Sequence, residues 1–483
     1  MRARTIFATA LSVATVGLTA AGCGGSSGGA AASDLGGAAS VAPSDAIGFV
    51  ALDTSITSAQ WQAVDGLLKK FPAQGDLMTK LQQSFEKHTQ LNWTTDVQPA
   101  LGSELDLIAL PSGSTATKPQ LVGLTQPADQ AKLDALLPKL GQGLVSAQIG
   151  GWTAFSDSQA ALDAVQSATA KLADNNTYRA ATAKLSADAL VRAYANGTEA
   201  QQLLDSLGSQ APSAGATGVP FAWASADVVV SGDGVRVNGY SRDVSLVGVP
   251  NNRRPVPTAP YSSSLVDEIP SGAILVADFS IAQGQFEYGG ASGPNSPLER
   301  LFGANTATLA SELDAILGGE TALYVRPGVP IPEITLVTQP TDTAAATSAL
   351  GDVIKALKQA AGGASAGGFN IGSIPIVHAI AGGQLVVSTS QQGIADFQSA
   401  GPKLSSDPSF KTAEQVSNMP DQTTGFLYVN LASALPLLEA IGPLLGLNLP
   451  STLQTDAGAL RTLTAYGTRN GDEAGFTLFL QVH

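Results

Sequence analysis

The feature that most constrains the fold is a hairpin-like segment that occurs twice in the chain. Residues 101–127 read LGSELDLIALPSGSTATKPQLVGLTQP, and residues 317–340 read LGGETALYVRPGVPIPEITLVTQP. Each copy has an alternating apolar run, a loop rich in Pro, Gly or Ser, and a second apolar run, which is the pattern of a β-hairpin. An internal repeat of this kind predicts two related domains in tandem.

Other segments recur in the same order around the two hairpins. They are an opening strand (41–53 and 268–278), a helix after the hairpin (129–140 and 342–360), a later strand (189–196 and 425–430) and a closing hairpin (221–242 and 460–483). Strands and helices do not strictly alternate, and several strands follow one another directly. This order predicts an α+β fold of two tandem related domains, each a mainly antiparallel sheet with helices packed on one face.

Composition divides the chain into five predicted parts. They are a lipoprotein signal peptide (1–22), a flexible Gly/Ala/Ser tether (23–39), a first α+β repeat (40–242), a Pro-rich linker (243–262) and a second α+β repeat (263–483). The tether lacks the apolar side chains that a core needs. The linker holds four prolines, which favour a stiff extended segment.

The amino terminus has the pattern of a bacterial export signal. Arg2 and Arg4 precede an apolar run from Ile6 to Ala21, and the run ends in Ala-Gly-Cys23. The run is too short for a comfortable transmembrane helix. Its end resembles the lipobox, which implies cleavage before Cys23 and a diacylglycerol on the Cys23 thiol. The protein is then expected on the outer face of the cytoplasmic membrane, held there by lipid. The alternative is ordinary secretion with a cut near Ala20 or Ala21.

Charge limits the classes of partner. The formal net charge is -14, and loss of residues 1–22 removes two arginines, which leaves 23 basic and 39 acidic residues, or -16. This sign argues against nucleic acid and against a basic membrane-docking surface. A solvated acidic surface is the plain interpretation, and capture of cations or of a basic partner is the alternative.

Residues with catalytic chemistry are few in this sequence. Cys23 is the single cysteine, and His88, His378 and His483 stand at no metal-binding spacing. The pattern GxSxG occurs at 24–28 and 363–367, but neither serine follows a predicted strand, as a nucleophile elbow requires. We therefore predict no catalytic residues, no metal site and no cofactor.

Paired polar residues in the two halves have structural and functional interpretations. Glu104 and Glu320 follow the hairpin-opening glycines; they are either a glycosidase-like carboxylate pair or caps that orient the start of each hairpin. Asn196 and Asn430 end equivalent strands and are predicted helix N-caps. In the closing hairpins, the aspartates at positions 233 and 472 are predicted turn residues rather than calcium ligands.

Several phrases resemble a family of exported bacterial proteins catalogued as a domain of unknown function. They are APSDAIGFVALD (42–53), DVQPALGSELDLIAL (96–110) and TQPAD (125–129), and the likeness extends from Val41 to the carboxyl terminus. The resemblance implies an extracytoplasmic location and a duplicated fold. It implies no catalytic residues.

Three functions remain open from the sequence. The leading hypothesis is a non-enzymatic, lipid-anchored module of the cell envelope that binds a partner or organises the envelope. The alternative is a carrier of a lipid or other apolar ligand in a cavity between helices and sheet. The third is an unrecognised hydrolase. The expected partners are the membrane, through the anchor, and an apolar small molecule or an envelope protein. The ligand-binding residues and the oligomeric state stay open.

Overall fold

The structure is a computed structural model that describes most of the chain beyond the amino terminus. The described residues are 35–72, 83–84, 86–87, 91–111, 119–141, 143–197, 221–244, 258–282, 306–328, 332–361, 365–366, 369–370, 375–441 and 456–483. The predicted signal peptide, Cys23 and His88 lie outside them. The fold is α+β, with antiparallel sheet and several helices, as the sequence predicts.

The chain divides into two compact units. The first has Met1–Ala214, Pro220–Val244 and Asn470–Thr477, and the second has Gly215–Val219, Ser245–Arg469 and Leu478–His483. The tip of the last hairpin therefore groups with the first unit, although its sequence lies inside the predicted second repeat.

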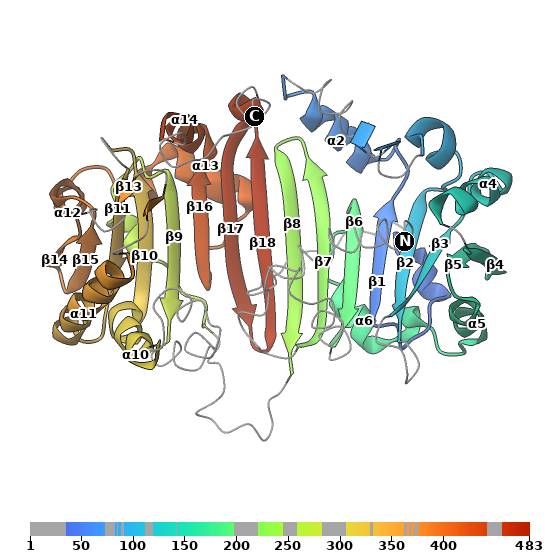
Figure 1. Cartoon of the computed structure of the whole chain (residues 1–483), viewed down its shortest axis with the longest axis horizontal. Helices are drawn as coiled ribbons and strands as arrows, with labels where there is room; N and C mark the ends of the chain where they lie inside the picture. The colour runs from blue at the N-terminus through green and yellow to red at the C-terminus, as the bar shows by residue number, and fades with distance from the viewer. Residues whose placement is uncertain are drawn as a thin grey trace. The chain divides into compact units, whose positions relative to one another are not determined.

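The first unit contains an antiparallel sheet in the order β8-β7-β6-β1-β2-β3-β5-β4 (Figure 1). Its strands are β1 (Gly48–Asp53), β2 (Glu104–Leu110), β3 (Gln120–Thr125), β4 (Val145–Ile149), β5 (Trp152–Ser156), β6 (Val191–Asn196), β7 (Phe221–Ser231) and β8 (Gly234–Asp243). The predicted hairpin is confirmed, since β2 and β3 pair from Leu105 with Thr125 to Leu110 with Gln120.

Helices of the first unit begin at polar caps. They are α2 (Ala59–Leu68), α4 (Gln130–Leu140), α5 (Gln159–Ser167) and α6 (Asn176–Thr182), with 3-10 helices η1 (Gly37–Ser40) and η3 (Leu172–Asp174) and a π-helical turn η2 (Trp93–Val97). The side chains of Ser58, Asp129, Ser158 and Asn175 accept backbone N–H groups at the starts of the α-helices. Side-chain capping thus explains where these helices start.

Helices pack on both faces of the sheet, which corrects the prediction of one covered face. On β5, Ala154 lies in a cluster with Leu162 of α5, whereas the next residue, Phe155, lies in a second cluster with Leu133 of α4. Successive side chains of a strand point to opposite faces, so α5 and α4 cover opposite sides. The sequence pattern missed this because both helices are short and amphipathic.

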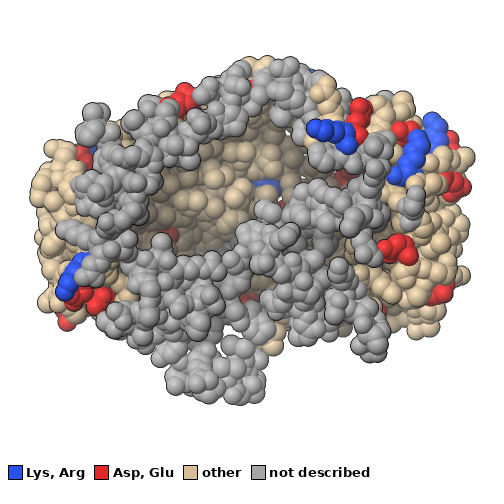
Figure 2. All heavy atoms as spheres, in the orientation of Figure 1, with Lys and Arg blue, Asp and Glu red and all other residues tan. Residues whose placement is uncertain are grey.

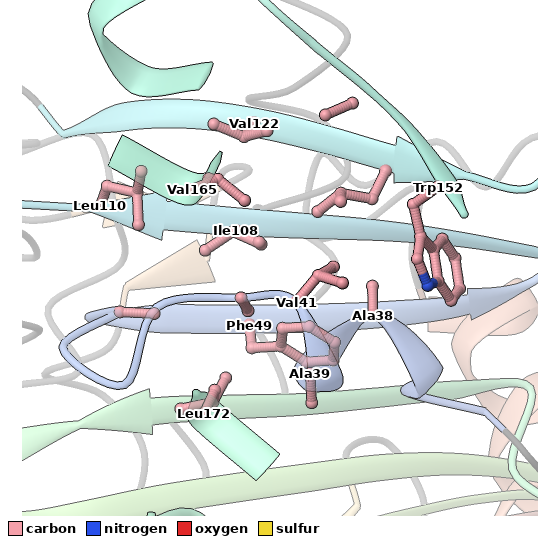
Figure 3. Close-up of a cluster of buried hydrophobic side chains, with 14 of the residues drawn as sticks. Ala38, Ala39, Val41, Phe49, Ile108, Leu110, Val122, Trp152, Val165 and Leu172 are labelled. Atoms are coloured by element: carbon pink, nitrogen blue, oxygen red, sulfur yellow. The ribbon is translucent and has the colours of Figure 1, made fainter. Parts of the chain in front are cut away.

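The predicted tether is also corrected at its carboxyl end. Gly37–Ser40 form η1, and Ala38 and Ala39 are buried against Phe49 and Trp152 (Figure 3). Alanine buries fully where a larger side chain would not fit, so this Gly/Ala-rich stretch forms part of a core. Residues 37–39 of the predicted tether are therefore part of the folded first unit.

The second unit contains an antiparallel sheet in the order β14-β15-β11-β10-β9-β16-β17-β18. Its strands are β9 (Leu275–Ile281), β10 (Gly319–Arg326), β11 (Glu333–Thr338), β14 (Val377–Ala381), β15 (Gln384–Ser388), β16 (Gly425–Asn430), β17 (Leu460–Asn470) and β18 (Glu473–Val482), with a separate pair β12 (Ser365–Ala366) and β13 (Phe369–Asn370). The second predicted hairpin is confirmed by the pairing of β10 with β11.

Helices of the second unit also lie on both faces. They are α10 (Thr306–Leu317), α11 (Thr343–Ala361), α12 (Gln391–Gln398), α13 (Pro408–Ser417) and α14 (Leu431–Ile441), with 3-10 helices η6 (Leu265–Asp267), η8 (Leu404–Ser406) and η10 (Ala457–Ala459). On β15, Val386 packs with α12 and α13, whereas Leu385 packs with α10 and α11. Among the described helices, none combines the length and apolar character needed to cross a bilayer.

The carboxyl end of the predicted linker belongs to the second unit. Tyr261 exchanges two backbone hydrogen bonds with Thr423, of 2.8 and 3.0 Å, and its hydroxyl donates to Asp278 at 2.5 Å. Residues 258–262 are therefore attached to the sheet by hydrogen bonds. Residues 245–257 of the linker lie outside the described part of the chain.

Candidate functional site

The two faces of the second sheet differ in how completely they are covered. One face carries Val276, Ala322, Tyr324, Phe426 and Tyr428, which are fully or almost fully buried under α12, α13 and the 3-10 helices. The residues between them in sequence point to the other side and are partly exposed. The second face is the candidate site.

We call this second side the apolar face. Its members are Leu275 and Ala277 of β9, Leu323 and Val325 of β10, Ile334 and Leu336 of β11, Leu427 and Val429 of β16, and Leu463 of β17. The register places Ile334, Val325, Leu275, Val429 and Leu463 side by side in one row across five strands. Neighbouring strands lie about 4.8 Å apart, so the row extends for roughly 19 Å.

Exposed isoleucines continue the apolar face toward the edge of the sheet. Ile334 is 41% exposed, and Ile376 and Ile380 beside or within β14 are 37% and 48% exposed. All three point to the side opposite Val377 and Ala379, which pack into the covered core. Three of the four large hydrophobic side chains that are exposed in the described residues therefore share this face. Ile380 is separated from the row by Leu385 of β15, which pairs with it and is fully buried against α10 and α11 on this same side. The candidate binding surface is therefore the partly exposed row that ends at Ile334, since exposed apolar surface of this kind is typical of a binding site.

The positively charged side chain of Arg461 lies at the end of the apolar face. Arg461 has the same parity along β17 as Leu463, whereas the intervening Thr462 is buried and donates to Gln481 at 2.8 Å on the other side. Arg461 is partly exposed and makes no hydrogen bond or ion pair with another described residue. Its guanidinium is thus available to a ligand.

In the first unit, the equivalent side of the central strands is buried at its centre. Val50, Leu107 and Ala193, on the side of β1, β2 and β6 away from Phe49, are 5%, 7% and 3% exposed and pack on one another. The helix α2 lies against β7, where Gln60 accepts the Val230 N–H at 2.7 Å. Leu52 and Val191 pack against these residues and are themselves partly exposed, so the first unit covers the centre of this side, though not all of it.

The predicted glutamate of the first unit caps a 3-10 helix. Glu104 Oε1 accepts the N–H of Gly37 at 3.0 Å and that of Gly36, and Asp106 accepts the N–H of Ala38 at 3.0 Å. Burial and the neighbouring Glu104 raise the pKa of Asp106 well above its ordinary value. This pair holds η1 on the sheet, which favours the capping interpretation of Glu104.

The glutamate of the second unit has the same kind of partner. Glu320 accepts the Leu265 N–H at 3.0 Å and the hydroxyls of Ser263 and Ser264 at 2.8 and 2.7 Å. Ser263 also donates to Asp278 at 2.9 Å. Burial raises the pKa of Asp278 to about 7, against the opposing effect of the Tyr261 hydrogen bond. Each glutamate is thus engaged by an amino-terminal segment of its own unit.

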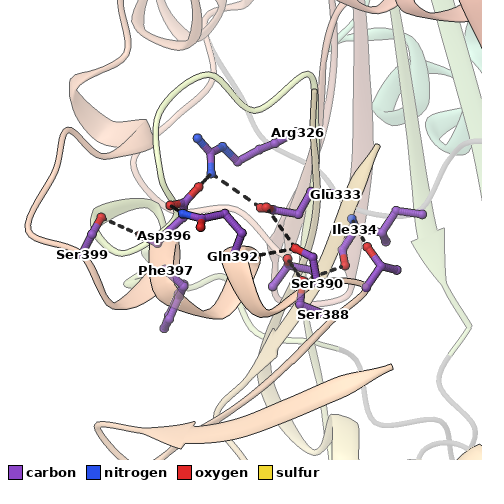
Figure 4. Close-up of polar contacts among 12 residues, drawn as sticks. Arg326, Glu333, Ile334, Ser388, Ser390, Gln392, Asp396, Phe397 and Ser399 are labelled. Atoms are coloured by element: carbon purple, nitrogen blue, oxygen red, sulfur yellow. Dashed lines mark hydrogen bonds and ion pairs between the residues drawn. The ribbon is translucent and has the colours of Figure 1, made fainter. Parts of the chain in front are cut away.

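A second polar cluster lies where β10, β11 and α12 meet (Figure 4). Arg326 pairs with Asp396 and lies 3.5 Å from Glu333. The hydrogen bond from Arg326 lowers the pKa of Asp396, whereas burial raises that of Glu333. Ser390 donates toward Glu333 at 3.5 Å and caps α12 through the Gly393 N–H. These contacts tie the hairpin end to the helix, so we assign the cluster a structural role.

The remaining sequence candidates are scattered. His378 is exposed on β14, and His483 donates its N–H to Ala459 at 2.8 Å. Asn430 accepts the Ser433 N–H at 3.1 Å, which confirms the predicted cap of α14. Of the 363–367 motif, only the two residues of β12 are described. Within the described ranges, no three His, Cys, Asp or Glu side chains are grouped to hold a metal ion.

On the side seen in Figure 2, the charged side chains of the described residues form small groups of both signs among a larger area of uncharged residues. Sequence reasoning missed the apolar face as a site. A signal for this face is present in the sequence, because β9, β10 and β16 carry apolar residues at successive positions and so on both sides of the sheet. A strand with one solvated face would instead alternate apolar and polar residues.

Comparisons with known proteins identify no relative. No family model matches the chain, and no curated protein matches it. Among solved structures, crystal forms IV and III of TP0453 are similar over 42% of this chain and over 79% and 78% of theirs. The TM-score is 0.23 in both cases, with 8% and 6% sequence identity. A likeness this weak carries no argument about fold or function.

Proposed function

We propose that this protein is an exported, lipid-anchored binding protein without catalytic activity, and that its ligand is an apolar small molecule held on the apolar face of the second unit. The observation that carries the proposal is the row from Ile334 to Leu463, whose side chains stay partly exposed while the other side of the same strands is buried. The Ala-Gly-Cys23 signal supports the location and the anchor.

The strand arrangement favours a small ligand over a protein strand. The strands β10, β9 and β16 are hydrogen-bonded on both sides, so their backbone groups are already satisfied. The apolar face therefore offers side-chain contact only, which suits an alkyl or aromatic group. Each Å² of apolar surface covered contributes about 25 cal/mol.

The carboxylates support a role other than hydrolysis. A glycosidase needs one free acid and one free base or nucleophile beside the scissile bond. Glu104 and Glu320 instead accept backbone N–H groups of η1 and of the start of η6. Their hydrogen-bonding capacity is used in holding these segments.

We also propose that the two units are copies of one ancestral module. The strands of the two sheets are arranged in the same way relative to their order in the chain. Read from the closing hairpin outward, the order is β8-β7-β6-β1-β2-β3-β5-β4 in the first unit and β18-β17-β16-β9-β10-β11-β15-β14 in the second. Equivalent isolated bridges join Pro43 with Lys171 and Pro270 with Lys403. An experimental structure whose corresponding strands failed to superpose would contradict this proposal.

Native mass spectrometry of the mature protein, before and after organic extraction, tests the proposed function. We expect a co-purifying apolar molecule that is lost on extraction, and lower occupancy in Leu427→Ser, which places a hydroxyl in the apolar face. The matched control is Ala432→Ser, an exposed position on α14. Full occupancy in Leu427→Ser, or no ligand in any preparation together with no binding of added alkyl probes, would refute the proposal.

A further inference from the structure

The polar end of the ligand, whose presence rests on the proposed function, has a candidate partner in the second unit. The apolar face ends at a cation: Arg461 lies two residues before Leu463 on the same side of β17. Leu463 is the last member of the row that also contains Val429 and Leu275. A guanidinium and an apolar row therefore lie next to each other on one side of the sheet.

Among the residues that the structure describes, no carboxylate pairs with this guanidinium. Arg461 makes no ion pair or hydrogen bond within the described residues, although it is partly covered. The other described arginines of the second unit, Arg326 and Arg469, both have partners; Arg326 pairs with Asp396 and Glu333. In a chain with a formal charge of -14, one free cation beside an apolar surface is a specific place for an anion.

We propose that the second unit binds an amphiphile with one long alkyl chain and an anionic head group, with the chain along the row from Leu463 to Ile334 and the head group on Arg461. Arginine suits the head-group role because its planar fork of N–H donors matches a carboxylate or phosphate. The row of roughly 19 Å gives an extended chain continuous apolar contact over five strands.

The test compares two probes that differ only in charge. Oleate and methyl oleate have the same chain, and their affinities for the delipidated mature protein are measured by titration calorimetry. We expect wild type to bind oleate about tenfold more tightly than methyl oleate, as one charge-assisted hydrogen bond provides. Arg461→Gln removes this preference, and Arg461→Lys keeps most of it. The control Lys355→Gln, an exposed position on α11, changes neither affinity.

The experiment distinguishes a failure of the head-group assignment from a failure of the proposed function. Equal affinity of wild type for both probes, or an unchanged preference in Arg461→Gln, overturns the assignment of the head group and leaves the apolar site standing. No binding of either probe overturns the proposed function itself. Since the measured quantity is a ratio of affinities within one protein, partial unfolding of a variant does not imitate the expected result.

Discussion

The carboxyl group of Asp278 makes the stability of the second unit depend on pH. Its side chain is 2% exposed, and its pKa rises from an ordinary value of 3.8 to about 7 because burial disfavours the charged form. The folded protein therefore holds this proton more tightly than the unfolded chain. The resulting stability is fully present below pH 3.8 and is lost as the pH rises through about 7.

The magnitude follows from the two pKa values. A difference of about three pH units corresponds to about 4 kcal/mol in total, at about 1.4 kcal/mol for each unit. Between about pH 5 and about pH 8 the contribution falls by about 2.6 kcal/mol. In Asp278→Asn the side chain no longer titrates, and its carbonyl still accepts a hydrogen bond from Tyr261 or Ser263. We expect the variant to lose this share of the pH dependence.

Urea unfolding of the full mature chain at the two pH values measures the difference, with hydrogen exchange of β9 and β10 peptides reporting on the second unit. Asp106→Asn, an equally buried carboxyl in the first unit, is the matched control and leaves the exchange of β9 unchanged. An identical pH dependence in wild type and Asp278→Asn would refute the reasoning, as would a wild type that gains stability in β9 between the two pH values.

Three further predictions test the packing on the two sides of β16, the close backbone contact at Gly102 and the lipid anchor at Cys23. Phe426→Ser, on the covered side of β16, destabilises the protein by about 3–5 kcal/mol in urea unfolding, whereas Leu427→Ser, on the apolar face, costs less than half as much; equal costs would contradict the two-sided account. Gly102→Ala lowers the thermal midpoint because the added Cβ would lie 1.8 Å from the Gln126 carbonyl oxygen, at a cost of about 1–3 kcal/mol; an unchanged midpoint would contradict this. Cys23→Ser abolishes incorporation of labelled fatty acid and leaves the precursor uncleaved, while processing like wild type would show that the signal is an ordinary secretory one.

The sequence predicted the hairpins well because their signals are local. The segments 101–127 and 317–340 each form two paired strands, and α4 starts after Asp129, the residue at the start of the predicted helix. Alternating apolar residues and a polar cap are read from neighbouring positions. No long-range information is needed for such elements.

Features that depend on distant contacts were mispredicted or missed. Gly37–Ser40 has the composition of a flexible tether, yet it forms a 3-10 helix that buries Ala38 and Ala39. Glu104 and Asp106, more than 60 residues later, accept the N–H groups of Gly37 and Ala38 and hold this helix in place. The short edge strand β4 was not predicted, and the strand predicted at 374–378 lies at Val377–Ala381 in the structure, as β14. The apolar face was missed as a site because composition alone does not distinguish a covered leucine from a partly exposed one.

Photolabelling tests the central claim most directly. A fatty acid carrying a diazirine in its alkyl chain is bound to the delipidated mature protein, irradiated, and the labelled peptides are identified by mass spectrometry. The account predicts label on β9, β10 and β16, concentrated at Leu275, Val325 and Val429, with loss of label when unlabelled oleate is present in excess. Label confined to the first unit, or label that excess oleate does not displace, would contradict the account.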